Sequence, residues 1–238
     1  MPRIFTKINK KNELEVLPVR IAKDIRDAKF KKLPPILMKP PFLTIIQAPV
    51  RSGKSNLIMW LVYKWYYHIF DEIIYISPTI QNDKTLKYLY KDKTIIKVNE
   101  NLEDLDSILS IIVDEQNEID EEDRDHKLIV LDDCLGFLNK SLAHLCSRYR
   151  HYKLSIIITS QSFRSVPVIC RVNSSQYILF RTNNKKELAK LEEEFSGNFP
   201  SFMDLYNRGT QEKYSFLYLD NEKIEAHRNF TELLYKKD

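Results

Sequence analysis

The chain of 238 residues has 43% hydrophobic and 29% charged side chains, which is typical of one globular domain with room for a short appendage. No apolar run approaches the roughly 20 residues that a membrane-spanning helix needs, and no apolar segment follows the charged N-terminus. We therefore expect neither membrane insertion nor a secretory signal. Three scattered cysteines without a CxxC pair argue against a zinc site or a disulfide framework and favour a reducing intracellular compartment.

The net charge of +4 is unevenly distributed along the chain. Residues 1–40 contain 11 Lys and Arg against 4 Asp and Glu, so this segment carries +7 and the remainder −3. Two proline pairs, Pro34-Pro35 and Pro40-Pro41, mark the end of the segment. We therefore predict a basic N-terminal arm over residues 1–41 and a folded domain over residues 42–238. The arm suits contact with nucleic acid or an acidic partner, and equally suits a solvated tail.

Strands and helices alternate through the rest of the chain. Short runs rich in Ile, Leu and Val predict strands at 42–47, 72–77, 93–98, 127–132, 153–160, 175–181 and 213–219. Helices are predicted at 55–70, 102–117, 140–150 and 185–195. Several strands are apolar on both faces, which is typical of a buried parallel sheet. The sequence therefore predicts an α/β fold with a mainly parallel sheet and helices on both faces.

The segment between the first strand and the first helix, Ala48 to Ser55, has the residue types of a phosphate-binding loop. It follows the pattern GxxxxGK[ST], with Ala48 in place of the first glycine. A small residue fits that position if its φ is negative. Backbone N–H groups of such a loop and of the following helix converge on anionic phosphates. A basic turn that merely precedes a helix is the alternative interpretation.

Each residue type at the end of this loop has a chemical reason. Gly53 lets the backbone approach the phosphates, Lys54 supplies a positive charge to the β- and γ-phosphates, and the Ser55 hydroxyl enters the shell of Mg²⁺. We therefore predict ATP and Mg²⁺ as ligands. The predicted nucleotide-binding residues are Ala48, Pro49, Val50, Arg51, Ser52, Gly53, Lys54 and Ser55.

Two successive carboxylates end the apolar strand predicted at 127–132. In a parallel sheet, Asp132 and Asp133 then lie at the carboxyl edge, where ligands bind. Asp132 is predicted to be a partner of Mg²⁺ and its water, and Asp133 to orient or deprotonate the attacking water. A turn or a helix cap is the alternative for such a pair.

The next strand along the chain ends in Thr159-Ser160-Gln161. A polar side chain at this place, for which we select Gln161, can contact the γ-phosphate or the attacking water; a simple turn is the alternative. Sequence for two strands separates the phosphate loop from the acidic strand. We therefore expect an extra strand to lie between these two in the sheet, unlike the arrangement in kinases and small GTPases.

Together these residues resemble the FtsK–HerA superfamily, and within it the genome-packaging ATPases of poxvirus-like large DNA viruses, virophages and polinton-type elements. The resemblance rests on the loop ending Gly53-Lys54-Ser55, on Asp132-Asp133, and on the stretch from Ser147 to Gln161. It covers residues 42–220. Two departures are the lost first glycine and Asp133, where many relatives carry Glu.

The resemblance implies a RecA-like core that assembles into a homo-oligomeric ring and acts on double-stranded DNA without sequence specificity. It also implies a capsid protein as partner, a viral assembly site in the host cytoplasm, and an arginine supplied by the neighbouring subunit. Arg148 and Arg150 are the candidates for that arginine, with Arg181 a weaker one; helix capping or contact with the DNA backbone is their alternative role.

The function implied is an ATP-hydrolysing motor that moves double-stranded DNA into a viral capsid during virion assembly. Two other functions remain open from the residues. One is a cellular or plasmid DNA translocase of the same superfamily. The other is a nucleotide-binding scaffold protein without turnover, because Asp133 reaches less far than a glutamate would.

Overall fold

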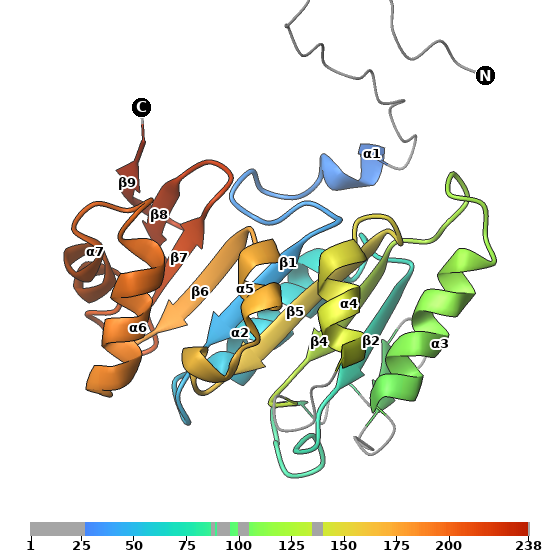
Figure 1. Cartoon of the computed structure of the whole chain (residues 1–238), viewed down its shortest axis with the longest axis horizontal. Helices are drawn as coiled ribbons and strands as arrows, with labels where there is room; N and C mark the ends of the chain where they lie inside the picture. The colour runs from blue at the N-terminus through green and yellow to red at the C-terminus, as the bar shows by residue number, and fades with distance from the viewer. Residues whose placement is uncertain (1–26, 87–88, 90–95, 100–104, 135–139, 238) are drawn as a thin grey trace, which may run out of the picture.

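The computed structural model describes residues 27–86, 89, 96–99, 105–134 and 140–237. Within these residues, one sheet of nine strands is covered by helices on both faces (Figure 1). The strands are β1 (Leu43–Gln47), β2 (Glu72–Ile76), β3 (Ile96–Asn99), β4 (Lys127–Leu131), β5 (Leu154–Ser160), β6 (Gln176–Phe180), β7 (Phe216–Asp220), β8 (Glu225–Arg228) and β9 (Glu232–Lys236). The predicted α/β class is confirmed.

The helices differ in length and in regularity. They are α1 (Asp27–Phe30), α2 (Lys54–Trp60) with its π-helical continuation η1 (Leu61–Tyr66), α3 (Leu105–Asn117), α4 (Lys140–Arg148), the 3-10 turn η4 (Phe163–Ser165), α5 (Val168–Asn173), α6 (Lys185–Phe195) and α7 (Phe202–Gly209). The helix predicted at 55–70 is thus α2 followed directly by η1. No helix in the described part of the chain is long and apolar enough to span a membrane.

The strand order is β3-β2-β4-β5-β1-β6-β7-β8-β9. Strands β1 to β6 pair in parallel, whereas β7, β8 and β9 add an antiparallel extension. The predicted extra strand between the phosphate loop and the acidic strand is present, and it is β5, which pairs with both β1 and β4. It is not one of the two strands that the sequence inserts between them. Those two strands are β2 and β3, and they lie on the far side of β4 from β1. This is because β4 pairs with β2 on one side and with β5, the next strand in sequence, on the other.

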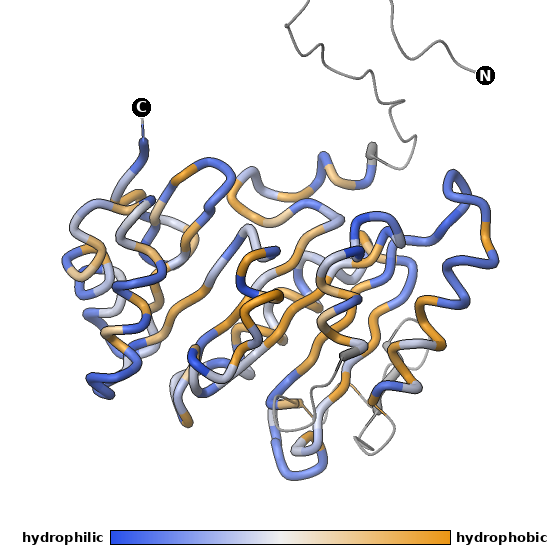
Figure 2. The backbone as a smooth tube through the Cα atoms, in the orientation of Figure 1, coloured by the Kyte–Doolittle hydropathy of each residue, from blue (hydrophilic) through white to orange (hydrophobic). Residues whose placement is uncertain are grey.

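The core has two layers, one on each face of the sheet. One cluster joins the strands to α3, α4, α5, α6 and α7, and the other joins them to α2, η1 and the segment that precedes β1. Side chains alternate between the two clusters along a strand: Leu43 and Ile45 face the first, and Phe42 and Ile46 the second. The apolar strands run through the middle of the molecule, with hydrophilic loops at their ends (Figure 2).

The last part of the predicted arm packs against the predicted domain. Phe30, Leu33, Leu37 and Met38 are each at most 6% exposed and belong to the second cluster. Their burial stabilises the domain, so this part of the predicted arm is part of the fold. Residues 1–26 of the predicted arm lie outside the described residues.

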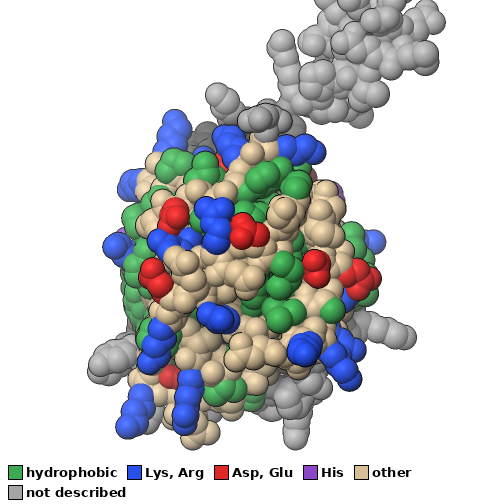
Figure 3. Space-filling model, turned by 90° about the vertical axis from the view of Figure 1, so that its left-hand side faces the viewer, with side chains coloured by type: hydrophobic (Ala, Val, Ile, Leu, Met, Phe, Trp, Pro, Cys, Tyr) green, Lys and Arg blue, Asp and Glu red, His purple; other side chains and the backbone are tan. Residues whose placement is uncertain are grey.

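The C-terminal hairpin was not predicted. Strands β8 and β9 carry several charged residues, and few of their side chains are buried, so they lack the apolar pattern of the inner strands. The edge of the molecule near β7, β8 and β9 shows Lys and Arg side chains spread among Asp and Glu (Figure 3). The third predicted strand, 93–98, overlaps β3, and its first residues lie outside the described part.

Candidate nucleotide site

The loop after β1 begins with a residue that must be small. Ala48 is completely buried, and its N–H donates to the carbonyl of Ser160 at 2.8 Å. Within the described residues, the positive φ angles of this loop belong to Arg51 (63°) and Gly53 (100°), and Ala48 is not among them. Ala48 thus meets the condition set for a small residue in place of the first glycine, because its φ is not positive.

Gly53 has a structural reason of its own. It lies in the left-handed region at the start of α2, which L side chains rarely adopt. A Cβ atom built on Gly53 would lie 3.2 Å from Cδ1 of Tyr214, so the ring of Tyr214 lies directly against the loop. From Lys54, the helix runs through α2 and η1 to Tyr66, and its N-terminus faces the loop.

An open pocket of about 430 Å³ lies over this loop. It is lined by Arg51, Ser52, Gly53, Lys54, Ser55, Asn56, Thr85 and Tyr214. The hydroxyl oxygen of Ser52 is buried and has no hydrogen-bond partner among the described residues. A buried hydroxyl without a partner, beside a basic loop, suits an anionic ligand that accepts a hydrogen bond from it.

Lys54 connects the loop to both predicted carboxylates. Its Nζ lies 2.7 Å from Oδ1 of Asp132 and 2.5 Å from Oδ2 of Asp133, and 3.3 Å from Oγ1 of Thr159. Burial alone would lower the pKa of Lys54, but the charges and hydrogen bonds of the two carboxylates outweigh it and raise the pKa above its ordinary value. Lys54 is therefore a permanent cation at neutral pH.

Asp132 is the more deeply buried carboxylate, with a side chain 2% exposed. Its Oδ1 also accepts the hydroxyl of Thr159 at 2.6 Å, and its Oδ2 accepts the hydroxyl of Tyr75 at 2.9 Å. Three donors, from α2, β2 and β5, thus fix one carboxylate. Burial and the two carboxylates raise the pKa of the nearby Cys134 thiol to about 12, so the thiol is protonated at neutral pH.

Asp133 occupies a more accessible position. Its side chain is 23% exposed, and its backbone is left-handed, with φ 55°. Its N–H donates to Oγ1 of Thr159 at 3.1 Å, so Thr159 contacts both aspartates and Lys54. The side chain of β5 that contacts the two aspartates is thus Thr159. The sequence analysis had selected Gln161, two residues later, as the polar residue of this segment.

Ser55 has an unpredicted partner. Its hydroxyl donates to Oδ2 of Asp83 at 2.7 Å, and Asp83 reaches it from the loop after β2. Oδ1 of Asp83 accepts the N–H of Thr85 at 2.8 Å. Burial would raise the pKa of Asp83, but these hydrogen bonds outweigh it and lower the pKa below its ordinary value. No periodicity or spacing marks Asp83, because the contact joins the first turn of α2 to the distant loop after β2.

Gln161 follows β5 at the predicted edge, and its side chain is exposed. Its carbonyl accepts from Nε2 of Gln47 at 3.3 Å. The loop it begins is held by Glu187 of α6, which accepts from the Ser162 hydroxyl at 2.7 Å and from the N–H of Phe163 at 2.8 Å. The structure therefore places Gln161 at the site edge without joining its side chain to the carboxylates by a hydrogen bond among the described residues.

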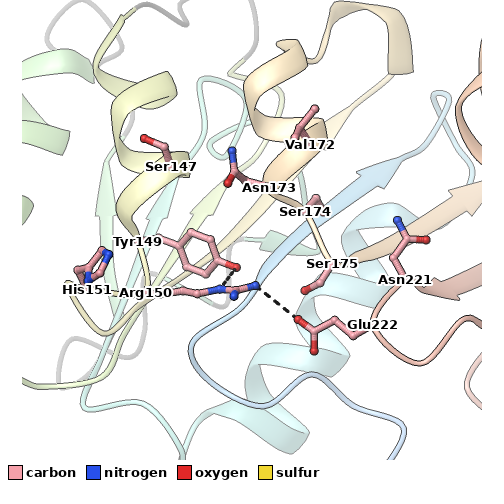
Figure 4. A pocket seen from close by; sticks show the side chains of 10 residues that line it. All are labelled: Ser147, Tyr149, Arg150, His151, Val172, Asn173, Ser174, Ser175, Asn221 and Glu222. Carbon is pink, nitrogen blue, oxygen red and sulfur yellow. Dashed lines mark hydrogen bonds and ion pairs between the residues drawn. The ribbon is translucent and has the colours of Figure 1, made fainter. Parts of the chain in front are cut away.

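Arg148 and Arg150 lie at the other edge of the sheet. Arg148 is the last residue of α4 and Arg150 follows it before the start of β5, whereas the phosphate loop follows the end of β1, which runs parallel to β5. Arg150 donates to the Tyr149 hydroxyl at 3.0 Å and pairs with Glu222 at 3.5 Å (Figure 4). Because the two edges are separated by the length of the strands, neither arginine contacts the nucleotide site of its own chain.

The donor set around the loop suits Mg²⁺ bound together with a nucleotide. Within the described residues, no group of three or more acidic, His or Cys side chains could hold a metal by itself. Mg²⁺ usually keeps several waters and takes one or two protein oxygens with the phosphates of a substrate. Ser55, Asp132 and Asp83 supply such oxygens around Lys54.

A phosphate loop after β1, two carboxylates after β4, and β5 between these strands define the chain as a P-loop NTPase of the type with an additional central strand. The family model described as Poxvirus A32 protein matches residues 28–198, which is more than half of the chain. The chain belongs to this family. The resemblance predicted from the sequence is therefore confirmed.

Two curated viral proteins are also similar to the chain. "Uncharacterized protein 075L" of Invertebrate iridescent virus 6 is 27% identical over 116 residues, 46% of this chain and 45% of that protein. "Uncharacterized protein L437" of Acanthamoeba polyphaga mimivirus is 25% identical over 165 residues, 63% of this chain and 56% of that protein. The chain thus spans about half the length of these curated relatives.

Solved structures share the fold at low sequence identity. The genome packaging NTPase B204 from Sulfolobus turreted icosahedral virus 2, in complex with AMP, superposes with a TM-score of 0.63 at 15% identity, over 84% of this chain and 100% of that chain. The pCW3 conjugation coupling protein TcpA, with ATPγS, gives a TM-score of 0.52 at 11% identity, over 75% of this chain and 57% of that chain.

Proposed function

We propose that the chain is an ATP-hydrolysing motor that moves double-stranded DNA into a viral capsid during virion assembly. The observation that carries the proposal is the position of Lys54, whose ammonium group contacts Asp132 and Asp133 at 2.7 and 2.5 Å under the phosphate loop. The family and the similar fold of a viral genome packaging NTPase support the choice of packaging.

The residues of the loop bind and orient the triphosphate. Backbone N–H groups of the loop and of the start of the helix face the phosphates. Lys54 holds the β- and γ-phosphates as a fixed cation, and Ser52 offers its unpartnered hydroxyl. When bound, Mg²⁺ neutralises charge on the β- and γ-phosphates; Ser55 and Asp132 are its proposed protein partners.

Hydrolysis uses a group that orients the attacking water or takes a proton from it. Asp133 suits this role because its carboxylate is next to the site and is partly exposed, whereas Asp132 is occupied by three donors. Gln161 is proposed to contact the γ-phosphate or the water, from a loop that Glu187 anchors. Such a contact couples the state of the nucleotide to the segment that follows β5.

The proposed motor is a homo-oligomeric ring. Since Arg148 and Arg150 lie at the edge opposite to their own phosphate loop, either can serve only a neighbouring subunit's nucleotide. A guanidinium at the transferring phosphate neutralises charge in the transition state. Arg150 contacts Tyr149 and Glu222, and its own side chain is 61% exposed. Its guanidinium is therefore accessible to another subunit.

Contact with DNA is proposed through phosphates and not through bases. The net charge of +7 over residues 1–40 suits the DNA backbone or an acidic capsid surface, in the host cytoplasm where virions assemble. Neutralising phosphates with Lys and Arg gives affinity that falls steeply with salt and carries no sequence preference.

ATP hydrolysis measured with and without linear duplex DNA tests the proposal. We expect hydrolysis that DNA stimulates at 50 mM salt and much less at 200 mM, and no hydrolysis by Lys54→Ala. ATP binding without turnover, with or without DNA, would favour a scaffold protein. Turnover by Lys54→Ala close to that of the parent chain would overturn the site.

A further inference from the structure

The pocket over the phosphate loop has one wall that the loop itself does not supply. Tyr214 lies in the connection between α7 and β7, far from the loop in sequence, and lines the pocket. Its ring meets Gly53, with Cδ1 3.2 Å from the place of a Cβ atom on that glycine. The residue is nevertheless 57% exposed, so one part of the ring touches the loop and another part faces solvent.

The backbone holds Tyr214 in an unusual conformation. It is the third residue of a turn from Glu212 to Ser215, closed by the N–H of Ser215 donating to the carbonyl of Glu212 at 3.1 Å. The Ser215 hydroxyl also bonds both backbone groups of Glu212, at 2.8 and 3.1 Å. Tyr214 has φ 69°, and glycine or asparagine ordinarily takes such a turn position. A strained aromatic residue beside a ligand loop indicates a binding role.

The sheet gives the direction in which a nucleotide must lie. The carboxylates that mark the γ-phosphate end follow β4, which is separated from β1 by β5. Tyr214 precedes β7, which is separated from β1 by β6 on the opposite side. A triphosphate on the loop with its terminal phosphate toward Asp132 and Asp133 therefore has its nucleoside on the side of Tyr214.

We propose that Tyr214 is the platform on which the nucleobase of the bound nucleoside triphosphate stacks. The ligand class is a purine nucleoside triphosphate, since the larger ring system gives the larger stacking area. The inference rests on the proposed function of the phosphate loop and adds the base-binding residue to it. Stacking joins the π-face of the base to the face of the aromatic ring. The ring of Tyr214 therefore makes the contact, and its hydroxyl is not needed for it.

Comparing ATP with inorganic tripolyphosphate separates stacking from support of the loop. Dissociation constants for both ligands are measured by calorimetry, with Mg²⁺, on the full chain and on Tyr214→Ala and Tyr214→Phe. We expect Tyr214→Ala to weaken ATP binding by about 5- to 150-fold and to leave tripolyphosphate binding unchanged. Tyr214→Phe keeps the ring and should keep ATP affinity.

An equal loss for both ligands in Tyr214→Ala would mean that the ring only shapes the loop, and no loss for either would mean that the ring does not contribute to ligand binding; both overturn the proposal. A parent chain that binds neither ligand would instead remove the phosphate-site assignment. Tyr214→Trp gives a second readout, since ATP should quench the new fluorescence and tripolyphosphate should not.

Discussion

The Ser55 hydroxyl donates a hydrogen bond to Asp83 at 2.7 Å. The Asp132 carboxylate accepts from Lys54, Thr159 and Tyr75. The two oxygen centres expected to share Mg²⁺ are thus held by separate hydrogen-bond partners. A carboxylate from the loop after β2 therefore positions the first protein oxygen offered to the metal, and its effect can be measured separately from that of Asp132.

Asp83→Asn should weaken the contribution of Mg²⁺ to nucleotide binding. Asparagine still caps the turn at Thr85 but removes the charge beside Ser55. Loss of a partner that orients a metal ligand typically lowers metal affinity 10–100-fold. We therefore expect the Mg²⁺ concentration needed for half-maximal ATP binding to rise about 10-fold. ATP binding in EDTA should not change.

The matched control for that variant is Asp204→Asn. Asp204 lies on α7, is exposed and pairs with Arg208 at 3.7 Å. The substitution therefore removes the same charge at a place away from the phosphate loop. An equal Mg²⁺ response for Asp83→Asn, Asp204→Asn and the parent chain would show that Asp83 merely caps its turn.

Lys54→Met should destabilise the fold as well as stop hydrolysis. Methionine keeps the length of the side chain but leaves Asp132, 2% exposed, without its cation. Breaking a buried pair costs several kcal/mol, and the partial exposure of Asp133 lowers this to about 2–4 kcal/mol. Urea unfolding measures the free energy. The loss in Lys54→Met/Asp132→Asn should be smaller than the sum of the single losses, by about 1–3 kcal/mol.

The pH dependence of this effect follows from the raised pKa of Lys54. A group whose pKa is raised on folding contributes fully below its ordinary value, here 10.5, and loses the contribution only as the pH rises through the higher folded value. The difference in stability between the parent chain and Lys54→Met should therefore stay constant from pH 7 to pH 10. A difference that disappears within this range would contradict the pairing.

The local parts of the site were predictable from sequence, and the reason is their contiguity. The phosphate loop is one segment between a strand and a helix, and Asp132 and Asp133 directly follow a strand, so residue type and order place them. Tyr75 and Asp83 reach the site across 57 and 28 residues of chain. Nothing in their own segments signals those contacts.

The strand order, too, was only partly predictable from local sequence. An extra strand between β1 and β4 was expected, but its identity as β5 depends on which distant strands pair. The burial of Phe30 and Leu37 was missed because lysines and prolines dominate that segment. Its few apolar side chains find their partners only in the folded sheet.

Asp133→Asn should bind ATP normally and fail to hydrolyse it. A positioned general base contributes about 10²–10⁴-fold, so we expect turnover to fall by at least about 100-fold with ATP affinity nearly unchanged. Asp133→Glu keeps a carboxylate and should retain part of the activity. Stopped hydrolysis in both variants would assign Asp133 to structure, through its contacts with Lys54 and Thr159.

Arg150→Ala subunits should be rescued by Lys54→Met subunits. In a mixed ring, the intact loop of the first can receive the arginine of the second, and such arginines contribute about 10³–10⁵-fold. Arg148→Ala is tested in the same way, and Arg208→Ala, on the surface of α7, should be active alone. Rings that contain both subunit types, shown by two affinity tags, and remain inactive would place Arg150 outside the catalytic reaction.

Displacement of a third strand from a DNA triplex measures movement along the duplex most directly. With ATP and Mg²⁺, the chain should displace a triplex-forming oligonucleotide from linear duplex DNA at 50 mM salt. Lys54→Met should not displace it, and a non-hydrolysable ATP analogue should not support displacement. Vigorous DNA-stimulated hydrolysis by the parent chain without any displacement would contradict the assignment of this P-loop NTPase as a DNA motor.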